Sequence, residues 1–543
     1  MLASMSRRFG WVAARRGLLL AASALFVCLM VSMTLAGRHG VVSEDLASYL
    51  APAVAIVRGT GAPYVNYFDV KPPGLIFFFV PWIALFGWSM KSLVVLDVLL
   101  LSADMALYYY LLRRVAPPGL RDAVYAVSLV AAFGLQLFGG MFLISESIGS
   151  LLLLLALALA LRFRSRPFAF LLIGALCALA GQVKEVWFFS VIPFGVLALQ
   201  VGAVRWRTVA CLAAGWAVML GLIVGGLFAI GAQHAYWDVL QYKATAFPLP
   251  GLKEALKGLV TTVRSESSLV FLLWPAFPIV VGWAVYLRVR VLGFSAAFRE
   301  LLSFNDSFLT LSFLTWACLV VGYVWQDKPV RGHSFVMLFI PFLLLTAAGL
   351  VYVGHALSNS KSRDFLRRGR TAAIVIGLVL IPSTSVLTGI GDRYDEFRAS
   401  DQVSAVATLE DAASTAKYAV MASHLRGTGC LQVAYGWNSG AAYMYTGANP
   451  CSRYFLANLL TTDKVREEFR HDMTAMPPDV IVYETDMADL DVAAFEKTVF
   501  PYSSVLANCY KPTDTPTVFV ALYDPTVQSR CIADELLAGG WES

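Results

Sequence analysis

The chain has 543 residues, of which 58% are hydrophobic and 14% are charged, and its mean hydropathy is +0.67. A soluble protein carries about 25% charged residues, so this composition excludes an ordinary soluble protein and indicates one whose main solvent is lipid. The net charge of +6 comes largely from Arg-rich segments between apolar stretches. That distribution is typical of membrane orientation, and we expect no nucleic-acid partner.

The first apolar stretch, Gly17–Ala36, follows a cluster of arginines and is long enough to span a bilayer. No clear Ala-x-Ala cleavage site follows it, so we expect a retained membrane helix and not a removed signal peptide. The N-terminus then lies in the cytoplasm, because positive residues stay on that side.

The segment Pro72–Trp88 decides the orientation of everything after it. If it spans the membrane, Arg113 and Arg114 lie outside and every later loop is inverted. If it lies in the interface, all the Arg-rich connections lie inside. We predict the interfacial arrangement and eleven spans with approximate cores at 17–37, 92–112, 122–141, 147–161, 167–183, 186–203, 208–231, 268–287, 307–325, 335–355 and 371–390.

The composition changes near Gly391, where a charged segment opens a region with no further span. Gln402–His424 is predicted to be an amphipathic helix, and turn residues separate three later β-rich runs. These runs are Leu431–Tyr435, Val480–Tyr483 and Val518–Tyr523. We therefore expect a mostly α polytopic helical bundle over residues 1–390, with an extracytoplasmic first loop at 38–91, and a small extracytoplasmic α/β domain over 391–543.

The eight cysteines divide evenly between the two regions. Four lie in apolar spans, where cysteine is usually a small core residue: Cys28, Cys177, Cys211 and Cys318. Four lie in the polar C-terminal region and suggest two disulfides in an oxidising compartment. The simplest of the three possible pairings joins Cys430 to Cys451 and Cys509 to Cys531. No spacing of metal ligands is evident, although nearby acidic residues do not exclude a divalent metal.

Two adjacent carboxylates, Glu44 and Asp45, closely follow the first span. Charge beside a bilayer is costly unless the site is wet and functional, and a carboxylate there can act as a general base toward an acceptor hydroxyl. An ordinary solvated loop end is the alternative. Further along the loop, Lys71 precedes two prolines that hold the backbone extended. Its ammonium is expected at the level of lipid phosphates, either binding one or snorkelling to the interface.

The acidic pair, Tyr49, Arg58-Gly59, and the run from Pro63-Tyr64 to Lys71-Pro72-Pro73-Gly74 together resemble the first periplasmic loop of GT-C glycosyltransferases. The resemblance is to the protein O-mannosyltransferase and lipid A aminoarabinose transferase group, especially its bacterial branch. It implies an inverting enzyme that takes a sugar from a polyprenyl-phosphate carrier and transfers it outside the cytoplasm. The family pattern is Asp-Glu, whereas this chain has Glu-Asp. Because the spacing to Tyr49 matches best if Asp45 stands for the aspartate of the family, we rank Asp45 first and Glu44 second as the base.

The resemblance also implies roles for other residues on the outer side. Binders of the donor phosphate would be Lys71, Arg58, Lys184, Arg331 and His333. Residues near the acceptor or sugar would be Tyr49, Tyr64 and Glu146. Simpler structural roles stay open: Glu146 as a helix cap, Lys184 as the partner of Glu185, and His333 as an interfacial histidine.

We therefore expect a glycosyltransferase of the bacterial inner (plasma) membrane, with polyprenyl-phosphate sugar as donor substrate and no evident cofactor. Its acceptor would be a cell-envelope glycan, a lipid or a protein. The alternatives are a transporter or flippase of a lipid-linked sugar, a ligase that uses a diphosphate-linked donor, and a silent assembly subunit. Loss of donor consumption in Asp45→Asn would separate these from the proposed enzyme.

Overall fold

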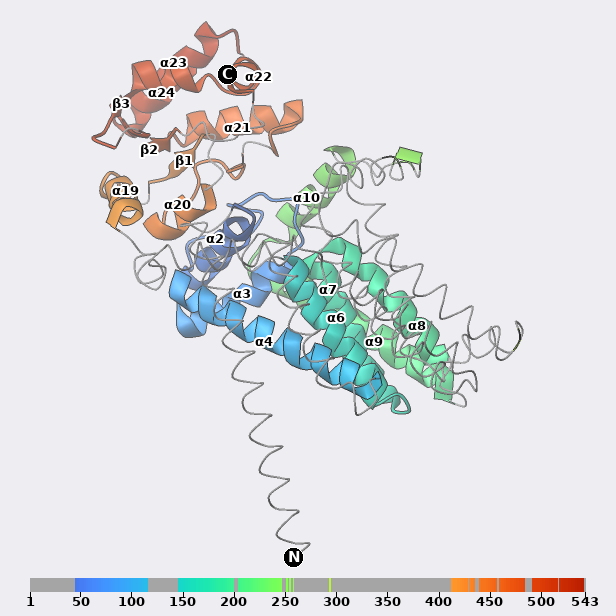
Figure 1. Ribbon diagram of the computed structural model, residues 1–543. Coiled ribbons are helices and arrows are strands. Elements are labelled where there is room, and N and C mark those ends of the chain that lie inside the picture. Colours follow the sequence, from blue (N-terminus) through green and yellow to red (C-terminus); the bar gives the residue numbers. More distant parts are fainter. Residues whose placement is uncertain are drawn as a thin grey trace, which may run out of the picture. The chain divides into compact units, whose positions relative to one another are not determined.

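The computed structural model describes residues 44–115, 145–199 and 204–246, a few isolated residues between 251 and 293, and 412–541 with short gaps. The chain divides into two compact units. Unit 1 comprises residues 1–35, 93–221 and 250–403, and unit 2 comprises residues 36–92, 222–249 and 404–543. The first loop and the C-terminal region thus belong to the same unit (Figure 1).

The described part of unit 1 is helical. Its elements are α6 (Ser145–Arg162), α7 (Pro167–Val183), the 3₁₀ helix η2 (Glu185–Ser190), α8 (Val191–Leu199) and most of α4 (Met90–Val115) and α9 (Arg205–Ala229), which begin and end, respectively, in unit 2. Pro167 occupies the first position of α7, where its missing N–H costs nothing. Gly174 and Gly215 let α7 and α9 approach closely, because a Cβ at either position would meet the backbone of the other helix.

Two helices among the described residues are long and apolar enough to cross a bilayer, over Lys91–Leu111 and Arg205–Ala229. Only 22% of the apolar window of the second is buried, so most of its surface needs an apolar solvent. With the composition, these helices place the chain in a membrane. Helices occupy five of the eleven predicted cores, but 186–203 is interrupted, since η2 precedes the short α8. The other six cores lie outside the described residues.

Unit 2 begins with two helices of the first loop, α2 (Glu44–Arg58) and α3 (Gly74–Phe86), and includes α10 (Gln233–Ala246). The 13 residues of α3 extend about 20 Å at 1.5 Å per residue, which is shorter than the roughly 30 Å of a bilayer core. This length suits the predicted interfacial position of Pro72–Trp88.

The C-terminal part of unit 2 is an α/β fold around a four-stranded sheet of order β1-β2-β4-β3. Its elements are α19 (Ala412–Ser423), β1 (Leu431–Val433), α20 (Ser439–Thr446), α21 (Asp463–Ala475), β2 (Val480–Val482), α22 (Val492–Thr498), α23 (Tyr502–Cys509), β3 (Tyr510–Pro512), β4 (Val518–Ala521) and α24 (Pro525–Ala538). β1 and β2 are parallel, whereas β4 runs antiparallel to both β2 and β3. The three predicted β-rich runs contain β1, β2 and β4.

Two disulfides hold this fold together. Cys430, just before β1, pairs with Cys451 after α20, and Cys509 at the end of α23 pairs with Cys531 in α24. These are the pairs of the simplest predicted pairing. Cys177 and Cys211 are free, and Cys177 is buried in α7.

The first loop packs directly on the C-terminal part of unit 2. Helix α2 lies against α20, and a Cβ at Gly440 would meet the backbone and side chain of Ala47. The backbone N–H of Phe68 donates to the carbonyl of Arg453 at 2.7 Å. The Asn449 amide donates to the carbonyl of Thr60 at 2.7 Å. A loop near the start of the chain is therefore completed by residues near its end.

Candidate active site

The acidic pair opens helix α2, with Glu44 and Asp45 as its first two residues. Their side chains lie outside the described part of the structure. Ser48 follows them by four and three residues, a spacing that places all three positions on one face of a helix. Pro52 lies inside α2 and has no N–H to offer the carbonyl four residues earlier, which belongs to Ser48.

The ammonium of Lys71 lies at this helix. Its Nζ donates to the Ser48 hydroxyl at 2.7 Å and lies 4.8 Å from the centre of the Tyr49 ring. The carboxylate of Asp69, whose side chain is only 7% exposed, lies 3.8 Å away. A cation held by one carboxylate, one hydroxyl and one aromatic face is oriented, yet the Lys71 side chain keeps 24% of its surface exposed. It is thus accessible to an anion.

The backbone around Lys71 is held at three points. The Tyr64 hydroxyl donates to the Lys71 carbonyl at 2.9 Å, and Lys243 of α10 donates to the Val70 carbonyl at 3.3 Å. The Lys71 N–H donates to the Asp69 carboxylate at 3.3 Å. Tyr64 is fully buried against Tyr236 and has a φ of 65°, which is uncommon for a residue other than glycine. The main role that this geometry gives Tyr64 is to hold Lys71 in place.

The remaining predicted site residues belong to several elements. Arg58 ends α2 and donates to the Met444 carbonyl at 3.2 Å. Tyr49 is buried beneath the Lys71 ammonium. Lys184 is the extended residue between α7 and η2 in unit 1. Glu146 is the second residue of α6, and its side chain is not described. Arg331 and His333 lie outside the described residues, so their predicted roles stay predictions.

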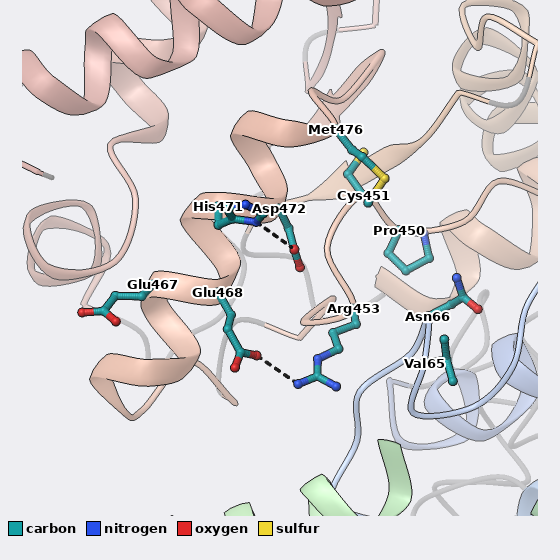
Figure 2. Close-up of a pocket in the computed structure, with 10 residues that line it drawn as sticks. All are labelled: Val65, Asn66, Pro450, Cys451, Arg453, Glu467, Glu468, His471, Asp472 and Met476. Carbon is teal, nitrogen blue, oxygen red and sulfur yellow. Dashed lines mark hydrogen bonds and ion pairs between the residues drawn. The ribbon is translucent and has the colours of Figure 1, made fainter. Parts of the chain in front are cut away.

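A cavity of about 630 Å³ opens beside the same loop in unit 2 (Figure 2). Val65 and Asn66 of the loop line it together with the segment after α20 and one face of α21. Its other lining residues are Pro450, Cys451, Arg453, Glu467, Glu468, His471, Asp472 and Met476. Six of these ten residues carry planar polar side chains that can pair with hydroxyl groups.

Two carboxylates of this cavity have shifted pKa values. Burial raises the pKa of Asp472, against a hydrogen bond from the Ser452 hydroxyl. Burial also acts to raise the pKa of Glu468, but hydrogen bonds from Tyr454 and Arg453 outweigh it, so the Glu468 pKa is lowered. Glu468 is therefore an anion at neutral pH whose charge is taken up by hydrogen bonds from Tyr454 and Arg453. Asp472 is more easily protonated than an ordinary aspartate.

Sequence reasoning included Tyr49 and Tyr64 but missed Ser48 and Asp69, which also hold Lys71. Ser48 had a detectable signal, because it follows the acidic pair by one helical turn. Asp69 lies two residues before Lys71, within the run from Pro63 to Gly74 that carries the resemblance. Nothing in the sequence linked Arg453 and the Glu468 beside it to the first loop, since the loop residue they support is hundreds of positions away. Among the described residues, no cluster of His, Cys, Asp and Glu has the geometry of a metal site.

No protein-family model and no curated protein matches the chain. Among solved structures, the chain is similar to ArnT from Cupriavidus metallidurans bound to undecaprenyl phosphate, at 15% identity and a TM-score of 0.48, over 90% of this chain and 95% of that one. It is also similar to the archaeal oligosaccharyltransferase AglB from Archaeoglobus fulgidus in complex with an inhibitory peptide and a dolichol phosphate. That match has 13% identity and a TM-score of 0.44, over 93% of this chain and 74% of that one.

Proposed function

We propose that the chain is an inverting membrane glycosyltransferase that takes its sugar from a polyprenyl-phosphate carrier. The observation that carries the proposal is the 2.7 Å hydrogen bond from Lys71 to Ser48. This bond holds the Lys71 ammonium, a cation suited to a phosphate, against the face of α2 whose first turn carries Glu44 and Asp45. A phosphate binder and a candidate base thus lie within about one helical turn of each other.

The reaction is a single displacement at the anomeric carbon. The acceptor hydroxyl attacks that carbon, and its proton passes to Asp45, with Glu44 as the second candidate. The bond between the anomeric carbon and the phosphate oxygen breaks, and polyprenyl phosphate leaves with the electron pair. Lys71 stabilises the negative charge that develops on the phosphate, so the leaving group needs no acid catalyst. Arg58, Lys184, Arg331 and His333 are proposed helpers at the phosphate.

The reaction takes place outside the cytoplasm in this proposal. Two disulfides in unit 2 favour an oxidising compartment. The first loop belongs to the same unit, and its hydrogen bonds to Arg453 and Asn449 require both segments to lie on one side of the membrane. A membrane-bound carrier presents its sugar at this surface. The proposed acceptor is a cell-envelope glycan, a lipid or a protein in the same compartment.

Donor consumption by the purified protein in lipid nanodiscs tests the proposal. Polyprenyl-phosphate sugars extracted from a deletion strain, where the unused donor accumulates, serve as substrates, and released polyprenyl phosphate is measured. We expect Asp45→Asn and Lys71→Met to lower turnover at least about 100-fold, the scale of one lost acid–base or electrostatic contribution. Lys511→Met, on the exposed side of β3, is the matched control and should keep full activity.

Two results would contradict the proposal at different levels. If the wild-type chain releases no polyprenyl phosphate from any accumulated donor, the assigned reaction is wrong. If the wild type is active and both Asp45→Asn and Glu44→Gln keep full turnover, only the assignment of the base is wrong. Retention of activity by Lys71→Met would likewise remove only the phosphate-binding role of that residue.

A further inference from the structure

Arg453 joins three segments of unit 2 at the base of the Lys71 loop. Its Nη2 donates to Glu468 of α21 at 2.9 Å and to the Tyr454 hydroxyl at 3.0 Å. Its Nη1 lies 3.5 Å from the carboxylate of Asp238 in α10. The side chain is only 22% exposed, and Figure 2 shows it reaching across the cavity toward Glu468. One guanidinium therefore ties α10 and α21 to the segment after α20.

The same guanidinium packs on the first loop. It lies 5.3 Å from the centre of the Phe68 ring, while the Arg453 carbonyl accepts the Phe68 N–H at 2.7 Å. The fully buried Phe68 ring also contacts the rings of Tyr242 and Tyr454, at 5.2 and 4.8 Å between centres. Backbone and side chain of Phe68 are thus both fixed by Arg453 and its neighbours, and the next three residues lead to Lys71.

Helix α10 carries the link to Lys71 itself. Asp238 is bound to Arg453, and Lys243, further along the same helix, donates to the carbonyl of Val70. Between them, Tyr242 donates to the Leu459 carbonyl at 2.6 Å, which fixes α10 on the C-terminal fold. A shift of α10 would therefore move the peptide group that precedes Lys71.

We propose that Arg453 is a positioning residue that sets the Lys71 ammonium for the donor phosphate. The inference rests on the proposed function, because it needs Lys71 to bind that phosphate. Arg453 touches neither donor nor acceptor in this role and acts only through Phe68 and α10. Arginine suits the position because its planar fork reaches two carboxylates and an aromatic face at once, which a lysine cannot do.

The test is a double-mutant cycle with the full chain in nanodiscs. Arg453→Met, Lys71→Met and the double variant are compared for donor KM and kcat, and for binding of undecaprenyl phosphate without a sugar. We expect Arg453→Met to raise the donor KM and to weaken undecaprenyl-phosphate binding, each by about 10- to 100-fold, the scale of a small misplacement of a binding group. In the Lys71→Met background the same change should add little, since residues that act through one another are not additive.

Control variants separate positioning from a general loss of folding. Arg470→Met removes an arginine of α21 that stacks on Trp541 and bonds the Val499 carbonyl, and it should leave phosphate binding unchanged. Arg453→Lys should recover part of the binding. Asp238→Asn, at a half-exposed carboxylate, should weaken phosphate binding in the same way but less. It replaces Arg453→Met in the test if that variant fails to fold.

The outcomes distinguish this inference from the proposed function. If Lys71→Met leaves phosphate binding intact, the proposed site itself fails. If Lys71→Met loses binding while Arg453→Met and Asp238→Asn behave as wild type, only the positioning role fails. Losses that multiply fully in the double variant would also overturn it, because they would show that Arg453 acts independently of Lys71.

Discussion

Lys71 shows how a single charged side chain is oriented by its neighbours. It bonds Ser48, faces the Tyr49 ring and lies near the buried carboxylate of Asp69. Of these partners, the Ser48 hydroxyl makes the shortest contact and can be removed with little change in volume. It therefore offers a direct measure of how much the orientation of the ammonium contributes to binding.

Replacement of Ser48 by alanine should weaken binding of the donor. A hydrogen bond to a charged group contributes about 1.5 kcal/mol or more, so we expect the donor KM to rise about tenfold in Ser48→Ala. Steady-state kinetics of polyprenyl-phosphate release provide the measurement. Ser423→Ala in α19 removes an exposed hydroxyl that bonds only its own helix, and should change nothing. An unchanged KM in Ser48→Ala would mean that the hydroxyl does not orient Lys71.

Glu468 makes the stability of the C-terminal fold depend on pH. Its pKa is lowered because hydrogen bonds from Tyr454 and Arg453 outweigh the effect of burial. A lowered pKa in the folded state stabilises the protein above the ordinary pKa of glutamate, and the stabilisation disappears as pH falls through the folded value. Glu468→Gln should thus unfold at a lower temperature than wild type at pH 7, and the difference should shrink as the pH falls below the ordinary glutamate pKa of about 4.3.

Thermal unfolding in detergent at pH 7 and pH 3.5 checks this expectation. A difference between Glu468→Gln and wild type that stays constant over this range would show that the carboxylate contributes through packing and not through its charge. Lys464, four residues earlier and largely exposed, is the control position, because its ion pair with Glu468 at 3.8 Å is screened by solvent. Lys464→Met should leave the unfolding temperature nearly unchanged at both pH values.

At the scale of elements, the packing of α2 on α20 decides where the acidic pair lies. The two helices approach so closely that a Cβ at Gly440 would meet Ala47, one residue before Ser48. Helix α2 therefore has one defined position against the C-terminal fold. Any wider separation would move the helix face that Lys71 contacts.

A methyl group at this contact should disturb both stability and activity. Alanine favours a helix over glycine by about 1 kcal/mol, but overpacking of this kind costs about 1–3 kcal/mol, so Gly440→Ala should be destabilising. Gly225→Ala in α9 is the control, because a Cβ there meets nothing within 4 Å. Thermal unfolding and donor turnover are the measurements. A variant as stable and active as wild type would show that α2 and α20 adjust without consequence.

The predicted elements show what sequence patterns convey and what they omit. The apolar runs predicted helices near α4, α6, α7 and α9, and β-branched runs predicted β1, β2 and β4. Strand β3 was missed because Tyr510–Pro512 is short and contains a lysine and a proline, the composition of an edge strand. The break between η2 and α8 was missed because the apolar run continues through it.

The scale of the whole chain is where sequence reasoning reached least far. The motif from Tyr49 to Lys71 marked the candidate site, but nothing in it indicated that Arg453 and Asn449 complete the loop. Contacts between residues so distant along the chain leave no local pattern, because nothing within either segment identifies the segment that it contacts. The pairing of the four C-terminal cysteines was easier to predict than these long-range contacts, since the two cysteines of each pair are only 21 and 22 residues apart.

The first loop and the C-terminal fold belong to one unit, so we expect both to lie on the same side of the membrane. Cysteines placed at Val65 in the loop and at Lys511 on β3, both exposed, should react with an impermeant maleimide added to intact cells. Wild-type protein, with its four C-terminal cysteines paired, controls for background labelling. Labelling of either position only after permeabilisation would contradict the proposed orientation, and labelling of one without the other would contradict the shared unit.

The bond between Arg58 and the Met444 carbonyl joins residues that are 386 positions apart. At a synthesis rate of 5–20 residues per second, about 20–80 s separate their emergence from the ribosome. During that interval the loop lacks the partners that shape it, so a nascent or truncated chain has the acids and the lysine but no assembled site. The candidate site is therefore assembled only after the residues around Met444 have been translated.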